Sequence, residues 1–400
     1  MRILFVIPQI SNFTGDAGLM LWLGETLKKK GHEILIVTSD ADPFVNDVVS
    51  SKKYAERRDL LTKNTEKVIQ IDEHQVLPIH STSYKLGMYC PNAKKIAEKL
   101  IPDYDLIHIF SWYYHLGIIF SQVAKKYNVP YAFTPFATLL PDAQKFFKRK
   151  KQIINLLYTK KMVTNASALH AVGNSEVPIF VKMGVDPKKI HTIENGIDLK
   201  EFEITPNSNI LKKIDLDKDE KFLLFFGRIH PKKGIEFLLK AFQKFHISHD
   251  DISLIIGGHG EQEYVEEIKL LVKKLGIESA VRFTGYATHE EKLELFTKAE
   301  VFLLTSLADV HPKAILESLS VGTPVIISKE CDFPEVEEFE AGIIVGLDIN
   351  EIHNALITMF ENEENRNKYS ENAHRLVNER FLLDNQIKKM IQMYENLIKK

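Results

Sequence analysis

The chain has 400 residues, more than one typical hydrophobic core holds, so we expect two domains of roughly 150–200 residues each. Its fractions of 44% hydrophobic and 26% charged residues are those of a globular protein, and no segment reaches the roughly 20 apolar residues of a membrane-spanning helix. Cys90 and Cys331 are the two cysteines, far apart and outside any CxxC pattern. This argues against a disulfide framework or a zinc site and predicts a cytoplasmic protein.

The net charge of −2 is unevenly spread along the chain. Residues 1–200 contain 27 Lys and Arg against 19 Asp and Glu, whereas residues 201–400 contain 25 against 35. Halves of opposite charge support two domains with different partners. The basic half fits an anionic acceptor or a membrane surface, and equally an ordinary solvated surface.

The first half alternates strands and helices. An apolar strand is expected over residues 2–8, and residues 19–30 have helical spacing that ends at Gly31, a natural C-terminal stop. Further strands are predicted at 32–39, 105–111, 130–135 and 167–173, and helices at 114–127, 144–162 and 175–183. This alternation predicts a parallel, doubly wound sheet.

A second alternating series begins with the strand at residues 221–228, after a charged, turn-rich segment. Strands at 252–258, 280–285, 301–306, 324–328 and 342–345 alternate with helices, and a last amphipathic helix spans residues 384–399. We predict an α/β protein of two Rossmann-like domains facing each other across a cleft. Their predicted ranges are 1–204 and 205–380, with a C-terminal helix in 381–400.

The segment 301–328 combines a strand, a polar loop, a helix and a second strand. Pro312 suits the start of that helix, because its missing N–H costs nothing there and its φ is already helical. Asp309 and Glu317 flank this helix N-terminus, which follows the carboxyl end of a parallel strand. Open α/β sheets bind ligands at that edge, and free N–H groups favour phosphate. An ordinary strand–loop–helix unit with two surface acids is the alternative.

The segment GRIHPKKG, residues 227–234, connects a strand to an amphipathic helix. Arg228 and Lys233 are suited to bind an anion, the guanidinium bidentately and the ammonium as a point charge. The alternative interpretation is a basic turn that binds no ligand. Gly15 follows the first strand and Gly258 follows another, at positions where a backbone can approach a ligand closely or simply turn.

These motifs resemble those of glycosyltransferase family 4, the retaining nucleotide-sugar glycosyltransferases with the GT-B fold. The donor-site signature of that family has a serine and two glutamates eight positions apart. Ser306 matches the serine, Asp309 replaces the first glutamate and Glu317 matches the second. Residues 310–312 replace Gly-Phe-Gly in the loop, while Arg228 and Lys233 match the Gly-Arg…Lys-Gly motif.

The resemblance implies that the first domain binds the acceptor, that the second binds the nucleotide sugar, and that the terminal helix crosses back onto the first domain. It also implies roles for these residues. Arg228 and Lys233 would stabilise the leaving diphosphate, Glu317 would anchor the nucleotide and Asp309 would contact the transferred sugar. The remaining donor-binding residues would be Gly15, Gly258, Tyr286, His311, Pro312 and Lys313. No metal and no cofactor are implied beyond the nucleotide diphosphate sugar as co-substrate.

One departure from the family pattern lies in the first half. Family members often have His-Gly after the strand that here ends at Thr134, whereas this chain has Phe136 and Ala137. A phenylalanine side chain cannot accept a proton or hydrogen-bond a sugar hydroxyl. That role is therefore lost or taken over elsewhere.

The function implied is transfer of a hexose-type sugar from a nucleotide diphosphate sugar to an acceptor hydroxyl. A glycan or lipid-linked acceptor is expected by analogy, in polysaccharide or glycolipid assembly, and no nucleic-acid partner is expected. The altered loop and the absent histidine leave a non-catalytic GT-B subunit as an alternative. A sugar-nucleotide epimerase is a second alternative, but it would need acid–base residues that the sequence does not reveal.

The stretch 145–161 combines seven cations with aromatic and aliphatic residues. Such a segment can bring an enzyme to an anionic membrane surface. Two of its lysines fall within the apolar arc of the helix, so a core-facing helix with a solvated basic edge stays an equal alternative.

Overall fold

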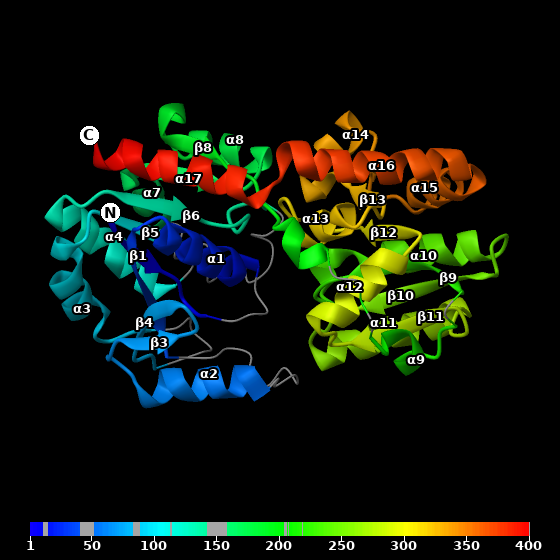
Figure 1. The fold of residues 1–400 in the computed structure, drawn as a ribbon, viewed down its shortest axis with the longest axis horizontal. Coiled ribbons are helices and arrows are strands. Elements are labelled where there is room, and N and C mark those ends of the chain that lie inside the picture. Colours follow the sequence, from blue (N-terminus) through cyan, green and yellow to red (C-terminus); the bar gives the residue numbers. More distant parts are fainter. Residues whose placement is uncertain are drawn as a thin grey trace. The chain divides into compact units, whose positions relative to one another are not determined.

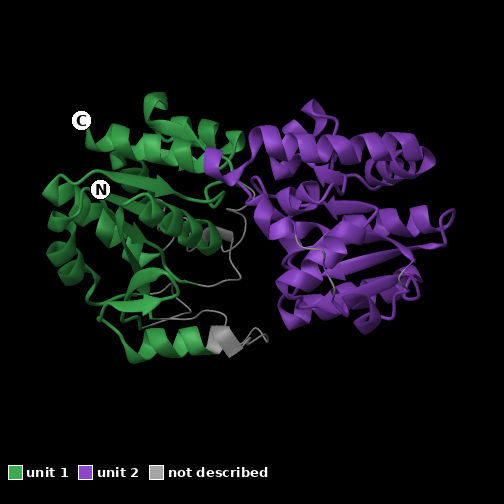
Figure 2. Ribbon diagram, viewed as in Figure 1, with its two compact units in different colours: residues 1–194, 386–400 green, residues 195–385 purple. Residues whose placement is uncertain are grey.

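The computed structural model describes residues 1–10, 15–40, 52–82, 89–112, 114–141, 158–203, 206, 208–217 and 219–399. These residues divide into two compact units (Figure 2). Unit 1 comprises residues 1–194 and 386–400, and unit 2 comprises residues 195–385. The predicted domain boundaries lay at 204 and 380, and the C-terminal residues 386–400 belong to unit 1.

Unit 1 is built on an eight-stranded sheet in the order β3-β4-β2-β1-β5-β6-β7-β8 (Figure 1). Its strands are β1 (Arg2–Val6), β2 (Glu33–Ser39), β3 (Ile69–Ile71), β4 (His74–Ile79), β5 (Leu106–Phe110), β6 (Tyr131–Thr134), β7 (Ala168–Ala171) and β8 (Ile190–Thr192). Its helices are α1 (Gly15–Lys29), α2 (Lys52–Lys63), α3 (Ala93–Leu100), α4 (His115–Tyr127), α7 (Lys160–Asn165), α8 (Val177–Lys182) and α17 (Leu383–Ile398), whose first residues belong to unit 2. All neighbouring strands run parallel except the β3–β4 pair.

The two faces of this sheet carry separate hydrophobic clusters, because side chains alternate along a strand. Ile3 and Phe5 of β1 pack in the cluster that contains residues of α1 and α17. Leu4 and Val6 pack in the cluster with residues of α3, α4 and α8. The C-terminal helix therefore contributes to the core of unit 1.

Unit 2 contains a parallel six-stranded sheet in the order β11-β10-β9-β12-β13-β14. Its strands are β9 (Lys221–Phe226), β10 (Ile252–Gly257), β11 (Val281–Gly285), β12 (Val301–Leu304), β13 (Val325–Ser328) and β14 (Gly342–Val345). Its helices are α9 (Ile210–Lys213), α10 (Ile235–His246), α11 (Gln262–Leu275), α12 (His289–Lys298), α13 (Lys313–Ser320), α14 (Glu335–Glu338), α15 (Ile349–Glu361) and α16 (Glu363–Arg380). In chain order this is the 3-2-1-4-5-6 arrangement of a Rossmann sheet, with its switch point between β9 and β12.

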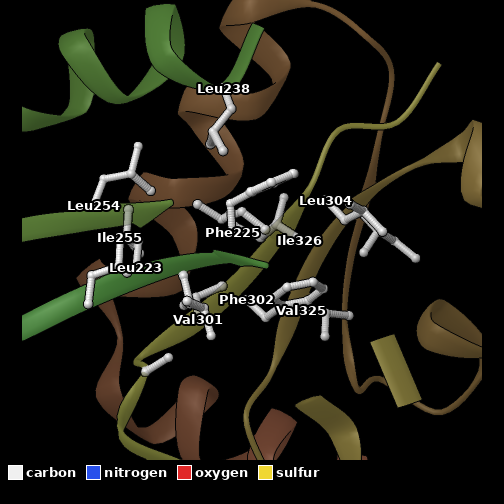
Figure 3. Close-up of a cluster of buried hydrophobic side chains, with 14 of the residues drawn as sticks. Leu223, Phe225, Leu238, Leu254, Ile255, Val301, Phe302, Leu304, Val325 and Ile326 are labelled. Carbon is white, nitrogen blue, oxygen red and sulfur yellow. The ribbon is translucent and has the colours of Figure 1, made fainter. Parts of the chain in front are cut away.

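The core of unit 2 explains its strand sequences. Helix α10 contacts α11 and α15, and a second series of contacts joins α9 to α12, α12 to α13 and α13 to α16, so the central strands are covered on both faces. Strands buried in this way read as nearly continuous apolar runs. Figure 3 shows Phe225, Leu254, Phe302 and Ile326, from four such strands, within the buried hydrophobic cluster.

The predicted α/β fold with two parallel-sheet domains is confirmed. The short hairpin of β3 and β4 and the helices α2 and α3 were not predicted, because their sequences are short or strongly polar. The predicted helix over 144–162 lies outside the described residues except for 158–162. Among the described helices, none is long and apolar enough to cross a membrane.

Candidate functional site

The candidate site lies at the switch point of the unit 2 sheet. Strands β9 and β12 are parallel neighbours, so their carboxyl ends meet at one edge. The loop after β9 carries Arg228 and Lys233, and the loop after β12 carries Asp309. Open α/β sheets bind ligands at such a point, because the two loops leave toward opposite sides.

Lys233 and Asp309 form an ion pair that joins the two loops. The Lys233 ammonium donates to Asp309 Oδ2, and Ser306 Oγ donates to the same oxygen over 3.2 Å. The backbones are also tied, since the Leu307 N–H donates to Lys232 O over 2.7 Å. Two residues predicted from separate motifs are thereby brought together.

Gly234 makes this close approach possible. Its φ is +59°, and a Cβ there would lie 2.2 Å from the carbonyl oxygen of Thr305. Thr305 Oγ1 in turn donates to Gly234 O over 3.0 Å. Any side chain at this position would push the lysine loop away from the aspartate loop.

The charges of the site control its protonation. Burial alone would raise the pKa of Asp309, but Lys233, Lys232 and the Ser306 hydroxyl outweigh it and lower that pKa, so the carboxylate is ionised. Burial lowers the pKa of Lys232, and Lys233 and Arg228 lower it further while Asp309 opposes them.

His230 lies on the same loop as these cations. Burial and the neighbouring cations lower its pKa to about 4, so its ring is neutral at pH 7. Its Nδ1 accepts the Lys232 N–H over 3.1 Å and begins the short turn that ends at Lys233. His230 therefore shapes the loop without adding charge to it.

Arg228 is the most exposed of the predicted cations. Its guanidinium lies 3.7 Å from a carboxylate oxygen of Glu261, and both side chains are largely solvated. Exposed pairs of this kind contribute about 0–1 kcal/mol, so a bound anion can replace Glu261 at little cost.

Glu317 lies on the second turn of α13, as predicted, and has a partner that the sequence did not reveal. Lys292 of α12 donates to its Oε1 over 2.6 Å, and the two side chains are 20% and 18% exposed. The ammonium orients the carboxylate and uses one of its two oxygens.

His311 is placed differently from the prediction. Its φ is +49° and its ring is 1% exposed, stacked on Phe333 at 4.0 Å and edge-on to Phe381 at 4.7 Å. Its N–H donates to Cys331 O, and its carbonyl accepts from Asn195. The side chain packs in the core beneath the loop, so a direct ligand contact by this ring is not supported.

The other residues predicted to bind a donor are spread over several loops. Pro312 was predicted to begin the helix, but it is the N-cap residue that precedes α13. The helix itself begins at Lys313. Tyr286 follows β11 and is 38% exposed. Gly15 begins α1 and belongs to unit 1, whereas the other predicted site residues all belong to unit 2.

Gly258 is required by loop packing. Its φ is +113°, and a Cβ there would lie 1.9 Å from the carbonyl oxygen of Gly227. The Gly258 N–H donates to Gly285 O over 3.0 Å. The glycine thus holds the loops after β9, β10 and β11 together, which by itself accounts for its presence.

Lys232 and Lys292 complete the arrangement but were not among the predicted site residues, whereas Ser306 had been matched to the serine of the family signature without a role. Lys232 follows Pro231 within the GRIHPKKG motif, so its cationic neighbours were a usable signal. Lys292 lies 25 residues before Glu317 on another helix, and no spacing rule connects the two.

Comparisons with known proteins agree with this geometry. Residues 207–376 match the model of glycosyl transferases group 1, and residues 20–201 match that of glycosyltransferase family 4. An uncharacterized glycosyltransferase of Methanocaldococcus jannaschii is 24% identical over 327 residues, which cover 80% of this chain and 77% of that protein. The alpha-monoglucosyldiacylglycerol synthase of Streptococcus pneumoniae is 25% identical over 338 residues, covering 80% and 68%.

Solved structures share the architecture. Anabaena HepE in complex with UDP and glucose superposes with a TM-score of 0.77 at 17% identity, covering 99% of this chain and 100% of that one. Sucrose-phosphate synthase of Thermosynechococcus elongatus gives 0.76 at 20% identity, covering 100% and 99%. At these identities the likeness shows the fold alone. Together with the two family models, it shows that the chain belongs to glycosyltransferase family 4 and is a glycosyltransferase of the GT-B fold.

Proposed function

We propose that the enzyme transfers a hexose-type sugar from a nucleotide diphosphate sugar to an acceptor hydroxyl, with retention of anomeric configuration. One observation carries this proposal. Arg228, Lys232 and Lys233 gather on one loop at the switch point of unit 2, where Asp309 pairs with Lys233 and the exposed Glu261 lies near Arg228, so the three cations outnumber the two carboxylates. The surplus of positive charge suits a ligand with two phosphates.

The cations act on the leaving group. When the glycosidic bond to phosphate breaks, negative charge grows on the departing diphosphate. Arg228 and Lys233 stabilise that charge electrostatically, without a metal ion. The solved structures of HepE with UDP and with UDP-glucose support this class of donor.

The acidic residues position the rest of the donor. Glu317 anchors the nucleotide, at its ribose, through the carboxylate oxygen that Lys292 does not occupy. Asp309 uses Oδ2 to hold Lys233, so its second oxygen is the one offered to the transferred sugar. The N-terminus of α13, with Pro312 and Lys313, adds backbone dipoles that favour phosphate.

Retention follows from attack on the same face as the departing phosphate. A phosphate oxygen of the leaving group helps to take the acceptor proton, so no dedicated base is needed. Phe136 at the position of the family histidine is compatible with this mechanism, because it removes no group on which the proton transfer depends.

The acceptor is proposed to be a glycan or a lipid-linked molecule, in polysaccharide or glycolipid assembly. The streptococcal relative, a synthase of a glycosylated diacylglycerol, supports the lipid-linked class. The stretch 145–161 would then bring the enzyme to an anionic membrane surface. Of this stretch the structure describes residues 158–161, which include Lys160, Lys161 and the exposed Tyr158.

Vesicle co-sedimentation tests the membrane contact. Binding should appear with anionic vesicles, weaken with salt and fall when Lys148, Arg149, Lys150 and Lys151 become Glu. The matched control changes four lysines of α10 and α11, namely Lys240, Lys269, Lys273 and Lys274. Equal sedimentation with neutral vesicles, or none with either kind, would exclude the contact.

Thermal-shift measurements with UDP, GDP and ADP test the donor site, because a ligand that binds the folded state raises its melting temperature. At least one nucleotide should raise it, and its sugar conjugate should release the diphosphate. Turnover should survive EDTA. If no nucleotide shifts the melting temperature, the proposed donor is wrong, and if Mn²⁺ restores activity lost to EDTA, the metal-free reaction is wrong.

A further inference from the structure

The loop from Asp309 to Pro312 has a strained backbone next to the candidate site. His311 has a φ of +49°, a conformation that glycine adopts freely and that other residues rarely adopt. The loop sequence Asp-Val-His-Pro contains no glycine. Strained residues of this kind persist where the surrounding structure over-determines them. The contacts that hold His311 therefore decide where the neighbouring loop residues lie.

Three contacts fix His311 in this conformation. Its N–H donates to Cys331 O over 3.0 Å, and its carbonyl oxygen accepts from the side-chain amide of Asn195 over 2.7 Å. Its ring packs against Phe333 and Phe381, with centroids 4.0 Å and 4.7 Å away. The backbone and the side chain of this residue are thus held independently.

Asn195 and Phe381 belong to the two terminal segments of unit 2, which comprises residues 195–385. These segments pair with each other. The Ile197 N–H donates to Phe381 O over 2.9 Å, and the Leu383 N–H donates to Ile197 O over 3.0 Å. Both terminal segments therefore contact the same loop residue, one at its carbonyl oxygen and the other at its ring.

The same loop carries groups that are proposed to bind the donor. Asp309 lies two residues before His311, pairs with Lys233 and donates its N–H to Glu330 O over 3.0 Å. Pro312 follows His311 directly and is the N-cap of α13. A change of φ at His311 would turn the start of α13 relative to the Asp309 carboxylate. Both parts of the proposed donor site thus depend on the backbone of this one residue.

We propose that Asn195 is a positioning residue of the glycosyltransferase reaction. Its amide holds the His311 carbonyl and thereby keeps Asp309 and the N-terminus of α13 in the geometry that binds the donor. This rests on the proposed function and adds a residue that acts through the loop. Without the amide, the carbonyl of a buried, strained residue loses its donor, which favours a relaxed backbone. The donor loop is in this way controlled from the terminal segments of unit 2.

Hydrogen exchange and nucleotide binding test this role on the full chain. Asn195→Ala removes the amide and should speed exchange of a peptide covering residues 305–312 about tenfold, because the loop opens locally more often. It should also raise the Kd of the nucleotide that raises the wild-type melting temperature by about fivefold, a size usual for residues that act through others. Asn195→Asp keeps the size of the side chain but has no N–H to donate when ionised, so it should have both effects.

Asn372→Ala is the matched control. Asn372 is 7% exposed and its Nδ2 donates to Glu340 O over 3.0 Å, so this variant removes an amide–carbonyl hydrogen bond of the same kind from the same unit. A purely structural role predicts that Asn195→Ala and Asn372→Ala lower the melting temperature and that neither changes the loop exchange or the Kd. The positioning role predicts that loop exchange and Kd change with Asn195 alone.

Phe381→Leu probes the other terminal segment. It keeps an apolar side chain but removes the flat ring against which His311 packs, so it should speed exchange of the same peptide. Together with Asn195→Asp, this variant keeps the test decisive if Asn195→Ala does not fold.

The outcomes separate this inference from the proposed donor site. If the wild type binds a nucleotide but the Asn195 variants leave loop exchange or Kd as in the wild type, or if Asn372→Ala changes them equally, the positioning role is overturned alone. If no nucleotide raises the wild-type melting temperature while loop exchange responds to Asn195→Ala, the donor proposal fails and the control of the loop by Asn195 stands.

Discussion

The carboxyl edges of the two sheets use polar residues in opposite ways. In unit 2, Lys233–Asp309 and Lys292–Glu317 are ion pairs whose side chains are all about one fifth to one quarter exposed. In unit 1, His108 of β5, Thr134 of β6 and His170 of β7 are neutral and fully buried. Charged groups that keep some access to water can exchange partners with a ligand, whereas buried neutral groups serve the fold.

These buried polar side chains of unit 1 form a chain of hydrogen bonds in which each group donates toward Ile193 O. His170 Nε2 donates to Ile193 O over 2.7 Å, since a carbonyl can only accept. Thr134 must then donate to His170 Nδ1 over 2.8 Å and accept from His108 Nε2 over 2.7 Å. Tyr394 of α17 donates to His108 Nδ1 over 2.5 Å. These directions hold because burial lowers the pKa of both histidines and keeps the imidazoles neutral, and the chain binds the C-terminal helix to the sheet.

The same fold thus contains a candidate site whose charged groups suit ligand binding. It also contains a network of neutral, buried groups whose hydrogen bonds are paired within the fold. Buried polar groups contribute to stability when every donor and acceptor is paired. Each part can be broken separately, and the consequences should differ: activity should respond to the unit 2 pairs, and stability to the unit 1 chain.

The largest effect is expected at Lys233. Lys233→Ala should lower turnover roughly 10²–10³-fold, because it removes an electrostatic stabiliser of the leaving group, and Arg228→Ala should lower it roughly 10²-fold. Lys240→Ala, an exposed lysine on α10, is the matched control. Steady-state release of diphosphate measures the effect, and turnover within threefold of wild type for both variants would remove the pair from the site.

Acidic pH should lower the free energy of unfolding, because of the buried histidines in unit 1. Burial is the main cause that lowers the pKa of His170 to about 4, and burial together with His170 lowers the pKa of His108 well below its usual value. Between pH 6.5 and 4 the unfolded chain binds protons that the folded chain does not, so the free energy of unfolding falls as the pH falls. His170 alone should account for about 3 kcal/mol across that window.

Urea unfolding between pH 7 and pH 4.5 measures this loss. His170→Gln should flatten the pH dependence, whereas His289→Gln, at an exposed histidine of unit 2, should leave it as in the wild type. An NMR titration that finds His170 protonating near pH 6.5 in the folded protein would contradict the neutral chain.

Tyr394→Phe should lower the free energy of unfolding by about 2 kcal/mol, because it leaves His108 Nδ1 without a donor in a dry core. The control Tyr89→Phe removes the hydroxyl of a half-exposed tyrosine and should cost much less. The urea midpoint measures both. Nucleotide affinity should not change in either variant, and a loss of affinity with Tyr394→Phe would show that the two regions are not independent.

The smallest expected effect is at Glu317. Glu317→Gln should weaken donor binding about tenfold, since a hydrogen bond to a charged group contributes roughly 1.5–3 kcal/mol and the amide keeps part of it. Glu300→Gln is the control, because Glu300 is paired with Arg366 in the same unit but has no proposed ligand role. Calorimetry measures the affinity of each variant for the nucleotide that raises the melting temperature. Equal affinities in the two variants would refute the anchoring role of Glu317.

Much of the candidate site could be predicted from the sequence because its signals are local. Arg228 and Lys233 stand within eight residues between a strand and a helix, and Asp309 and Glu317 bracket one helix start. Apolar runs and turn residues predicted the strands around them, since buried parallel strands leave a strong pattern. The β3–β4 hairpin was not predicted, because strands of three and six residues show little periodicity.

The pairings were decided by the tertiary structure. Lys233 meets Asp309 across 76 residues, and His108 meets Tyr394 across 286, because the order of strands and the return of α17 bring them together. His311 looked like a ligand residue in its loop, yet its positive φ turns the ring into the core between Phe333 and Phe381. Periodicity reports which residues are buried in an element but not which element covers them, so these contacts could not be derived from the chain alone.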